Sequence, residues 1–180
     1  AIDIMMAIPG LFFHKPKGYT IKEEQNFGDE ADILWAKTKK LKNSIIKDKT
    51  YLTWRYINNP DEYNIFKFYK NDEITGIMVL KQTTRKGVSF GEIIELIYSD
   101  SDITILKDMI LYAIDYLKKH GCAIVQAWVI KDSAIEKIYK SAGLFLKRSL
   151  IKLLLSPNSD IEAFYKKELW SFSQGDGNDI

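Results

Sequence analysis

Residues 104–130 read TILKDMILYAIDYLKKHGCAIVQAWVI, and they decide the fold because the clearest helix of the sequence is followed directly by its clearest strand. Apolar residues of the first half recur at helical spacing, and Gly121 is placed to end the helix. Residues 122–130 are almost wholly apolar, which is typical of a central strand covered on both faces. With a strand before the helix, this order implies a right-handed crossover onto a sheet.

Three strands are predicted upstream of this helix. Residues 63–69, 74–83 and 88–99 are rich in Ile, Val, Phe and Tyr, and short turn sequences separate them. Runs of this kind joined by tight turns indicate an antiparallel meander.

Weaker patterns surround this core. Residues 31 to about 47 fit an amphipathic helix whose lysines form a solvated basic face. Ser133 and Glu136 are spaced as a capping box for a helix that Gly143 closes. After it the sequence predicts a long strand at 144–155, a short helix at 159–167 and a final strand at 170–173. Residues 1–30 show no sustained period, and we interpret them as an irregular lead-in with a short strand around residues 11–13.

Composition bounds the class of protein. The 180 residues are 46% hydrophobic and 13% aromatic, enough for one sizeable core. A net charge of +2 gives no reason to expect a nucleic acid or an anionic membrane as partner, and no apolar run approaches the roughly 20 residues of a membrane span. The single cysteine, Cys122, cannot form an internal disulfide, and no Cys/His cluster suggests a metal. We therefore expect a reduced, cytoplasmic protein.

Three segments carry a family resemblance. Residues 132–144, DSAIEKIYKSAGL, look like the late helix of the GNAT acyltransferases, in which an Asn begins a run that ends in Tyr and is followed by Gly-Phe; here Asp132 and Leu144 replace the Asn and the Phe. Residues 51–56 with Asn59-Pro60, and residues 170–176, WSFSQGD, resemble a bacterial subgroup of GNAT-like proteins. The order of elements over roughly 31–175 is similar to the same fold.

The resemblance implies an α/β (α+β) fold with a mixed, mostly antiparallel central sheet flanked by helices. It implies a GNAT-like domain at residues 31–180. In the subgroup this domain commonly forms the carboxyl-terminal part of a longer chain. Residues 1–30 are then a lead-in or the remnant of a preceding domain, which agrees with a sequence that opens at Ala1 without Met.

The resemblance also implies an activity: transfer of an acetyl or acyl group from acyl-CoA to the primary amine of a small molecule or peptide. Tyr139 corresponds to the tyrosine that protonates the departing thiolate, and the alternative is a core tyrosine. A glutamate on the strand at 88–99 often relays a proton from the amine. Glu92 and Glu95 are three residues apart, so strand alternation points them to opposite faces, and we prefer Glu95 for this role. The alternative for Glu95 is a solvated or ion-paired side chain.

The expected CoA-binding loop departs from the family pattern. GNAT enzymes hold the pyrophosphate on a loop of the type Arg/Gln-x-x-Gly-x-Gly/Ala at the start of the main helix, where backbone amides are exposed. This chain has Tyr98-Ser99-Asp100-Ser101-Asp102-Ile103-Thr104, without glycine or a basic residue. Either CoA binds weakly here, or it binds elsewhere, or it does not bind. The cofactor contacts implied are the amide of Ile97 or Tyr98 on the thioester carbonyl, with Ser99, Asp102 and Thr104 in the loop.

Two more residues are candidates for substrate binding. Arg55 can clamp a carboxylate or phosphate, and the alternative for residues 54–56 is structural packing of the two aromatic residues with one surface ion pair. Asp176, on a glycine-flanked turn, can hold an ammonium, and a disordered polar terminus is the alternative. For the whole chain the rival to an enzyme is a catalytically silent GNAT-like module that binds a ligand or partner, or supports a neighbouring domain.

Overall fold

A strand, a helix and a parallel strand form the centre of the molecule. The computed structural model describes residues 2–7, 16–38, 44–99, 104–147 and 173–176. Strand β5 (Val88–Tyr98) leads to helix α3 (Thr104–Lys119), and β6 (Ile124–Ile130) returns parallel to β5. Gly121, with φ +82°, adopts the left-handed conformation that ends a helix. The strand, helix, strand prediction for this region is confirmed.

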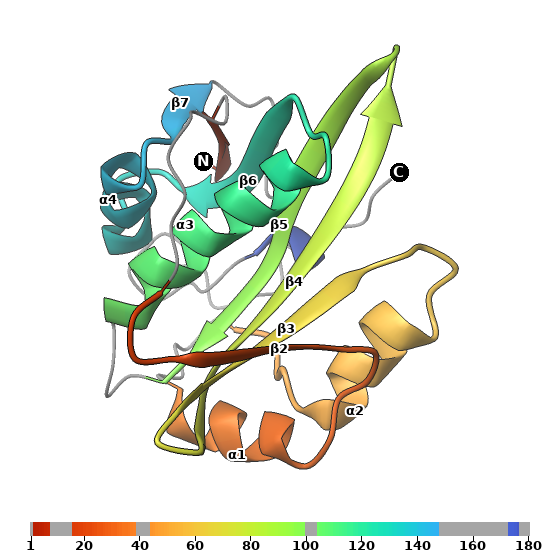
Figure 1. The fold of residues 1–180 in the computed structure, drawn as a ribbon, viewed down its shortest axis with the longest axis vertical. Helices are drawn as coiled ribbons and strands as arrows, with labels where there is room; N and C mark the ends of the chain where they lie inside the picture. The colour runs from red at the N-terminus through yellow and green to blue at the C-terminus, as the bar shows by residue number, and fades with distance from the viewer. Residues whose placement is uncertain (1, 8–15, 39–43, 100–103, 148–172, 177–180) are drawn as a thin grey trace, which may run out of the picture.

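One seven-stranded sheet runs through the molecule in the order β2-β3-β4-β5-β6-β1-β7 (Figure 1). Strands β3 (Asn64–Lys70), β4 (Glu73–Arg85) and β5 form the predicted antiparallel meander. Among the described strands, β5 and β6 form the only parallel pair, and every other neighbouring pair is antiparallel. The sheet is therefore mixed and mostly antiparallel, as predicted.

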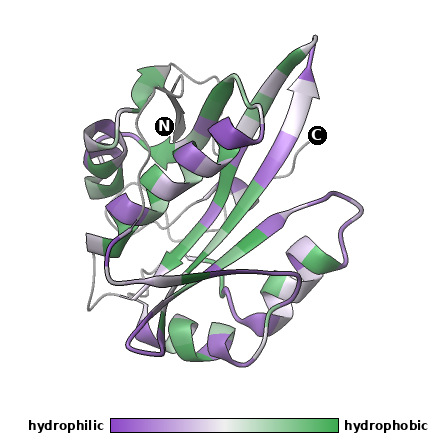
Figure 2. Cartoon of the chain, viewed as in Figure 1, coloured by the Kyte–Doolittle hydropathy of each residue, from purple (hydrophilic) through white to green (hydrophobic). Residues whose placement is uncertain are grey.

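Helices cover both faces of the sheet and define two cores. On one face α3 and α4 (Ala134–Ser141) bury residues such as Met109 and Tyr139 against β3–β6. On the other face α1 (Glu30–Lys37), α2 (Lys49–Leu52) and the π-helical turn Thr53–Ile57 cover β3–β5. Figure 2 shows hydrophobic and hydrophilic residues interspersed along α3, as a helix with one buried face requires.

Two glycines allow α3 to lie close to the sheet. A Cβ at Gly91 would stand 2.7 Å from Leu117 Cδ1, and a Cβ at Gly76 would stand 2.9 Å from Met109 Sδ. Both distances are shorter than van der Waals contact, so the helix packs directly on the backbone of β4 and β5.

The predicted helix from residue 31 to about 47 is wrong in length. Helix α1 ends at Lys37, because Thr38 turns extended and its hydroxyl and amide both donate to the carbonyl of Trp35. Residues 44–47 are not helical in the described part of the chain, and they bring Lys47 into the interior.

The irregular lead-in predicted for residues 1–30 is wrong for two segments. Strand β1 (Ile2–Ala7) lies between β6 and β7 (Phe145–Lys147), and β2 (Thr20–Glu24) pairs with β3. Strand β2 is mostly exposed and carries little apolar signal, so its pairing with the sheet holds it extended. The strand around 11–13, the helix at 159–167, strand residues 148–155 and 170–172 lie outside the described residues. No helix in the described part of the chain is long and apolar enough to cross a membrane.

Candidate active site

A β-bulge in β5 determines where its two glutamates point. Opposite β4, Val79 pairs with Glu95 and Leu80 pairs with Ile93, so Ile94 is an extra residue on β5. Glu92 and Glu95 therefore contact the same segment, the short 3-10 turn η4 (Gln174–Asp176) with the preceding serine. The prediction that the two glutamates face opposite sides of the sheet is wrong, because strand alternation is interrupted between them.

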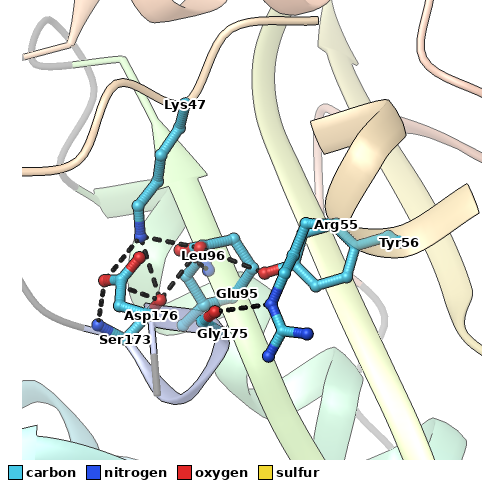
Figure 3. A network of polar contacts seen from close by, with 8 residues as sticks. All are labelled: Lys47, Arg55, Tyr56, Glu95, Leu96, Ser173, Gly175 and Asp176. Atoms are coloured by element: carbon cyan, nitrogen blue, oxygen red, sulfur yellow. Dashed lines mark hydrogen bonds and ion pairs between the residues drawn. The ribbon is translucent and has the colours of Figure 1, made fainter. Parts of the chain in front are cut away.

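Glu95 belongs to a largely buried group of five side chains that we name the Lys47 cluster: Lys47, Tyr56, Glu95, Ser173 and Asp176 (Figure 3). Lys47 Nζ lies 2.7 Å from Glu95 Oε2, 3.1 Å from Asp176 Oδ2 and 2.9 Å from Ser173 Oγ. The side chains of Lys47, Glu95 and Asp176 are 5%, 1% and 1% exposed. One ammonium group thus bridges two carboxylates inside the protein.

Both oxygens of Glu95 have hydrogen-bond donors. Oε2 accepts from the Tyr56 hydroxyl at 3.3 Å, and Ser173 Oγ lies 2.9 Å from it. Oε1 accepts from the backbone amide of Leu96 at 3.1 Å. The carboxylate is therefore held in one orientation by groups from three separate parts of the chain.

A π-helical turn and a glycine allow η4 to pack against the Glu95 carboxylate. In the turn Thr53–Ile57 the amide of Asn58 donates to the carbonyl of Thr53, five residues earlier. This hydrogen-bond spacing defines a π-helical turn, and such turns are frequent at functional sites. Arg55 Nε donates to the carbonyl of Gly175 at 2.9 Å. A Cβ on Gly175 would stand 1.9 Å from the Tyr56 hydroxyl oxygen, so this position requires glycine.

Burial and charge set the protonation of the Lys47 cluster. Burial raises the pKa of Glu95 above its ordinary value, and the nearby Asp176 charge raises it further, whereas Lys47 opposes the shift. Burial alone would lower the pKa of Lys47, but the charges of Glu95 and Asp176 outweigh it and raise that pKa. Lys47 is therefore a cation at neutral pH, and Glu95 takes up a proton more readily than an exposed glutamate.

Glu92 is the centre of a second buried group. It accepts from Gln126 Nε2 at 2.6 Å and from Gln174 Nε2 at 3.1 Å, and Arg85 Nη2 lies 2.6 Å away. Its side chain is fully buried, while that of Arg85 is 55% exposed. This carboxylate lies where β5 pairs with β6, opposite Gln126, whereas the pairing of the two strands ends at Ile93 and Ala127, before Glu95.

Tyr139 lies in the core beneath α4. The helix begins as the sequence predicts, since Ser133 Oγ accepts from the amide of Glu136 at 3.2 Å. Burial raises the pKa of Tyr139, and the charges of Glu95 and Tyr98 add to the shift. The hydroxyl therefore keeps its proton at neutral pH and is within electrostatic reach of Glu95. Its role as an acid stays a prediction.

The predicted cofactor contacts are distributed around the end of β5. The amide of Ser99 donates to the carbonyl of Thr75 at 3.0 Å, so by alternation the amide of Ile97 also points to β4 and that of Tyr98 to the opposite side, where β6 lies. Ser99 is buried, and Thr104 is exposed at the start of α3. Asp102 lies outside the described residues. Of the two candidate amides, that of Tyr98 points in the direction needed to donate a hydrogen bond to a ligand bound between β5 and β6.

The structure brings Glu95, Arg55 and Asp176 into one site, although they lie far apart in the sequence. Asp176 is buried and not part of a disordered terminus, and Tyr56 packs against Phe27 and Tyr63. Sequence reasoning missed Lys47, which it assigned to a solvated helix face, and no local pattern marks this residue. It also gave no role to Ser173, although Ser173 lies in the family-like segment 170–176. Among the described residues, no group of His, Cys, Asp and Glu side chains is arranged to hold a metal ion.

Comparisons with known proteins agree on the fold. No protein-family model and no curated protein matches this sequence. Among solved structures, a GNAT-family protein from Novosphingobium aromaticivorans DSM 12444 is 14% identical with a TM-score of 0.57, over 82% of this chain and 60% of that one. An aminoglycoside acetyltransferase from an uncultured soil metagenomic sample is 15% identical with a TM-score of 0.55, over 77% and 96%. Glucosamine-6-phosphate N-acetyltransferase from Arabidopsis thaliana is 12% identical with a TM-score of 0.52, over 77% and 99%.

These likenesses concern the fold. The chain spans less than two thirds of the length of the first of these proteins and 48% of a GCN5-related N-acetyltransferase from Sphaerobacter thermophilus. At such low identities a shared fold does not carry an activity with it, so function has to be argued from the site.

Proposed function

We propose that this chain, which has the fold of the GNAT acetyltransferases, transfers an acyl group from acyl-CoA to a primary amine. The observation that carries the proposal is the position of Glu95. A bulge turns this carboxylate into a buried cluster beyond the paired part of β5 and β6, beside a second carboxylate that suits an ammonium. Structural neighbours that are N-acetyltransferases support the kind of reaction.

Glu95 is the general base in this proposal. An attacking amine must lose a proton, and a base works best when its pKa lies near the operating pH. Burial moves the pKa of Glu95 upward, in that direction. Asp176 holds the ammonium of the acceptor, and Arg55 fixes the turn that carries Asp176.

In this proposal the residues at the end of β5 bind the acyl end of acyl-CoA. When bound, acyl-CoA supplies an acyl group activated as a thioester. The Tyr98 amide, which points to the side of β6, would donate a hydrogen bond to the carbonyl of that acyl group, and Tyr139, whose raised pKa keeps it protonated, is the acid for the leaving thiolate. Ser99 and Thr104 flank the segment proposed for the pyrophosphate. We further propose a cytoplasmic location, where acyl-CoA is available and Cys122 stays reduced.

A silent GNAT-like binding module is the second candidate function. One observation favours it: every oxygen of Glu95 already has a partner within the chain, and Lys47 stands where an acceptor amine is expected. In that case the Lys47 cluster holds η4 in place and performs no chemistry.

Melting curves distinguish the two functions. We expect acetyl-CoA and free CoA at millimolar concentration to raise the Tm, and ATP to leave it unchanged, because a ligand at about 100 times its Kd adds about 2.7 kcal/mol. A Tm that responds to none of the three would favour the silent module. If acetyl-CoA binds, amines can be screened as acceptors by measuring release of the CoA thiol. With the best amine, Tyr139→Phe should lower turnover sharply while the protein stays folded.

A further inference from the structure

The Lys47 cluster contains a primary amine that belongs to the chain itself. Lys47 Nζ lies 2.7 Å from Glu95 Oε2, the distance at which a general base takes a proton from an acceptor ammonium. The same nitrogen lies 3.1 Å from Asp176 Oδ2. Lys47 therefore has both partners that the proposed function assigns to an external acceptor.

We propose that Lys47 is itself an acyl acceptor, so that the protein acylates its own Lys47 from acyl-CoA. The inference rests on the proposed function, because it uses the same thioester and the same base. The Lys47 side chain is buried, its ammonium contacts oxygen atoms of Glu95, Ser173 and Asp176, and it needs no rearrangement to reach Glu95.

The reaction balances with groups already named. Glu95 Oε2 takes one proton from the Lys47 ammonium. The freed nitrogen lone pair forms an N–C bond to the thioester carbonyl carbon, and the C–S bond breaks with its electron pair on sulfur. The second proton leaves the nitrogen and ends on the CoA sulfur, so the products are acyl-lysine and free CoA, with Glu95 protonated.

Burial distinguishes this reaction from uncatalysed acylation. The Lys47 side chain is 5% exposed, whereas those of Lys119 and Lys140 are 53% and 52% exposed. A thioester that reacts without catalysis meets the exposed lysines first. Lys119 and Lys140 are also ion-paired, each with an acidic residue one helical turn away, so they are matched controls for pairing.

Acylation has a predictable effect on the cluster. It removes the positive charge and leaves the Glu95 and Asp176 carboxylates without their shared ammonium. Two buried carboxylates repel each other, so modified protein should be less stable than unmodified protein. The Tm should therefore fall as the occupancy of acyl-Lys47 rises.

The test is mass spectrometry of the intact, folded chain after incubation with acetyl-CoA whose acetyl group is deuterated. We expect labelled acetyl-Lys47 to accumulate faster than labelled Lys119 or Lys140. Glu95→Gln should slow labelling of Lys47 by about 100-fold or more, with no change at Lys119. Urea-unfolded protein is the control, and there the preference for Lys47 should disappear.

Three results would count against the inference, and they are distinguishable. If CoA raises the Tm but Lys47 takes up no more label than Lys119, the inference is wrong and the proposed function stands. If neither CoA nor acetyl-CoA raises the Tm and Lys47 is not labelled, the proposed function fails and the inference fails with it. A preference for Lys47 that persists in urea also overturns the inference, because the reaction then does not depend on the folded site.

Discussion

Glu92 and Glu95 are both buried, lie three residues apart on β5 and contact the same C-terminal turn, yet they have different surroundings. Glu92 faces two neutral amides and one partly exposed guanidinium, on the part of β5 that pairs with β6. Glu95 lies beyond that pairing and shares one buried ammonium with a second carboxylate. The first arrangement is balanced in charge and suits a structural role, whereas the second has an excess negative charge and suits chemistry on a cation.

The largest difference between the two glutamates should appear in turnover. Glu95→Gln removes the proposed base and should lower kcat by about 10²–10⁴-fold with little change in secondary structure. Glu92→Gln should leave kcat within a few-fold. Thiol release from acetyl-CoA with the best amine of a screen measures both, with circular dichroism as control. Equal losses in the two variants would remove the functional distinction between them.

The cations of the two groups should differ in their contribution to stability. Lys47→Met leaves two buried carboxylates unpaired and should lower the free energy of unfolding by about 3–5 kcal/mol. Arg85→Met removes a largely exposed partner from a carboxylate that keeps two amide donors, and should cost about 1 kcal/mol. Urea unfolding measures both. A loss in Arg85→Met as large as that in Lys47→Met would contradict the comparison.

Substitutions at two glycines test whether turnover depends on the position of η4. Gly175→Ala places a Cβ against the Tyr56 hydroxyl, so η4 must shift; we expect a loss of about 1–3 kcal/mol and a lower kcat. Gly91→Ala crowds Leu117 under α3 and should cost a similar free energy without a specific effect on kcat. Unaltered turnover in folded Gly175→Ala protein would mean that η4 is not part of the active site.

The smallest expected effect is one of pH. Folding raises the pKa of Glu95 above 4.5, so the folded state binds this proton more tightly than the unfolded state does. Stability should therefore fall as pH rises from 4.5 through the raised pKa, while activity should rise over the same range as the base ionises. Glu95→Gln should flatten both curves, and Glu92→Gln should flatten neither. Urea midpoints and rates measured from pH 4 to pH 8 test this.

The elements that the sequence predicted well are those with a strong local period. Helix α3, the meander β3–β5 and strand β6 each bury one or both faces, so the spacing of their apolar residues predicts whether each segment is a helix or a strand. Strand β2 was missed because pairing with β3, and not a local pattern, keeps it extended, and the apolar run of β1 is too short to show a period.

The site was predictable only in part, for a related reason. Glu95 was found through the family resemblance, and Arg55 and Asp176 through the chemistry of their side chains. The bulge at Ile94 adds a single residue to a strand without changing its composition, so the orientation of Glu95 relative to Glu92 could not be predicted. Lys47 reaches the interior only because α1 ends at Lys37, and its partners lie up to 129 positions away in the sequence.

The position of β1 has a consequence for the order of folding during synthesis. Strand β1 is made before both strands that it pairs with: Ala7 pairs with Val125 and Met6 pairs with Phe145. Pairings of such high sequence separation form slowly, because a long loop must close before they contribute. During synthesis the meander can assemble before β6 and β7 are available to pair with β1. The last step of folding should therefore be the pairing of β1 with β6 and β7.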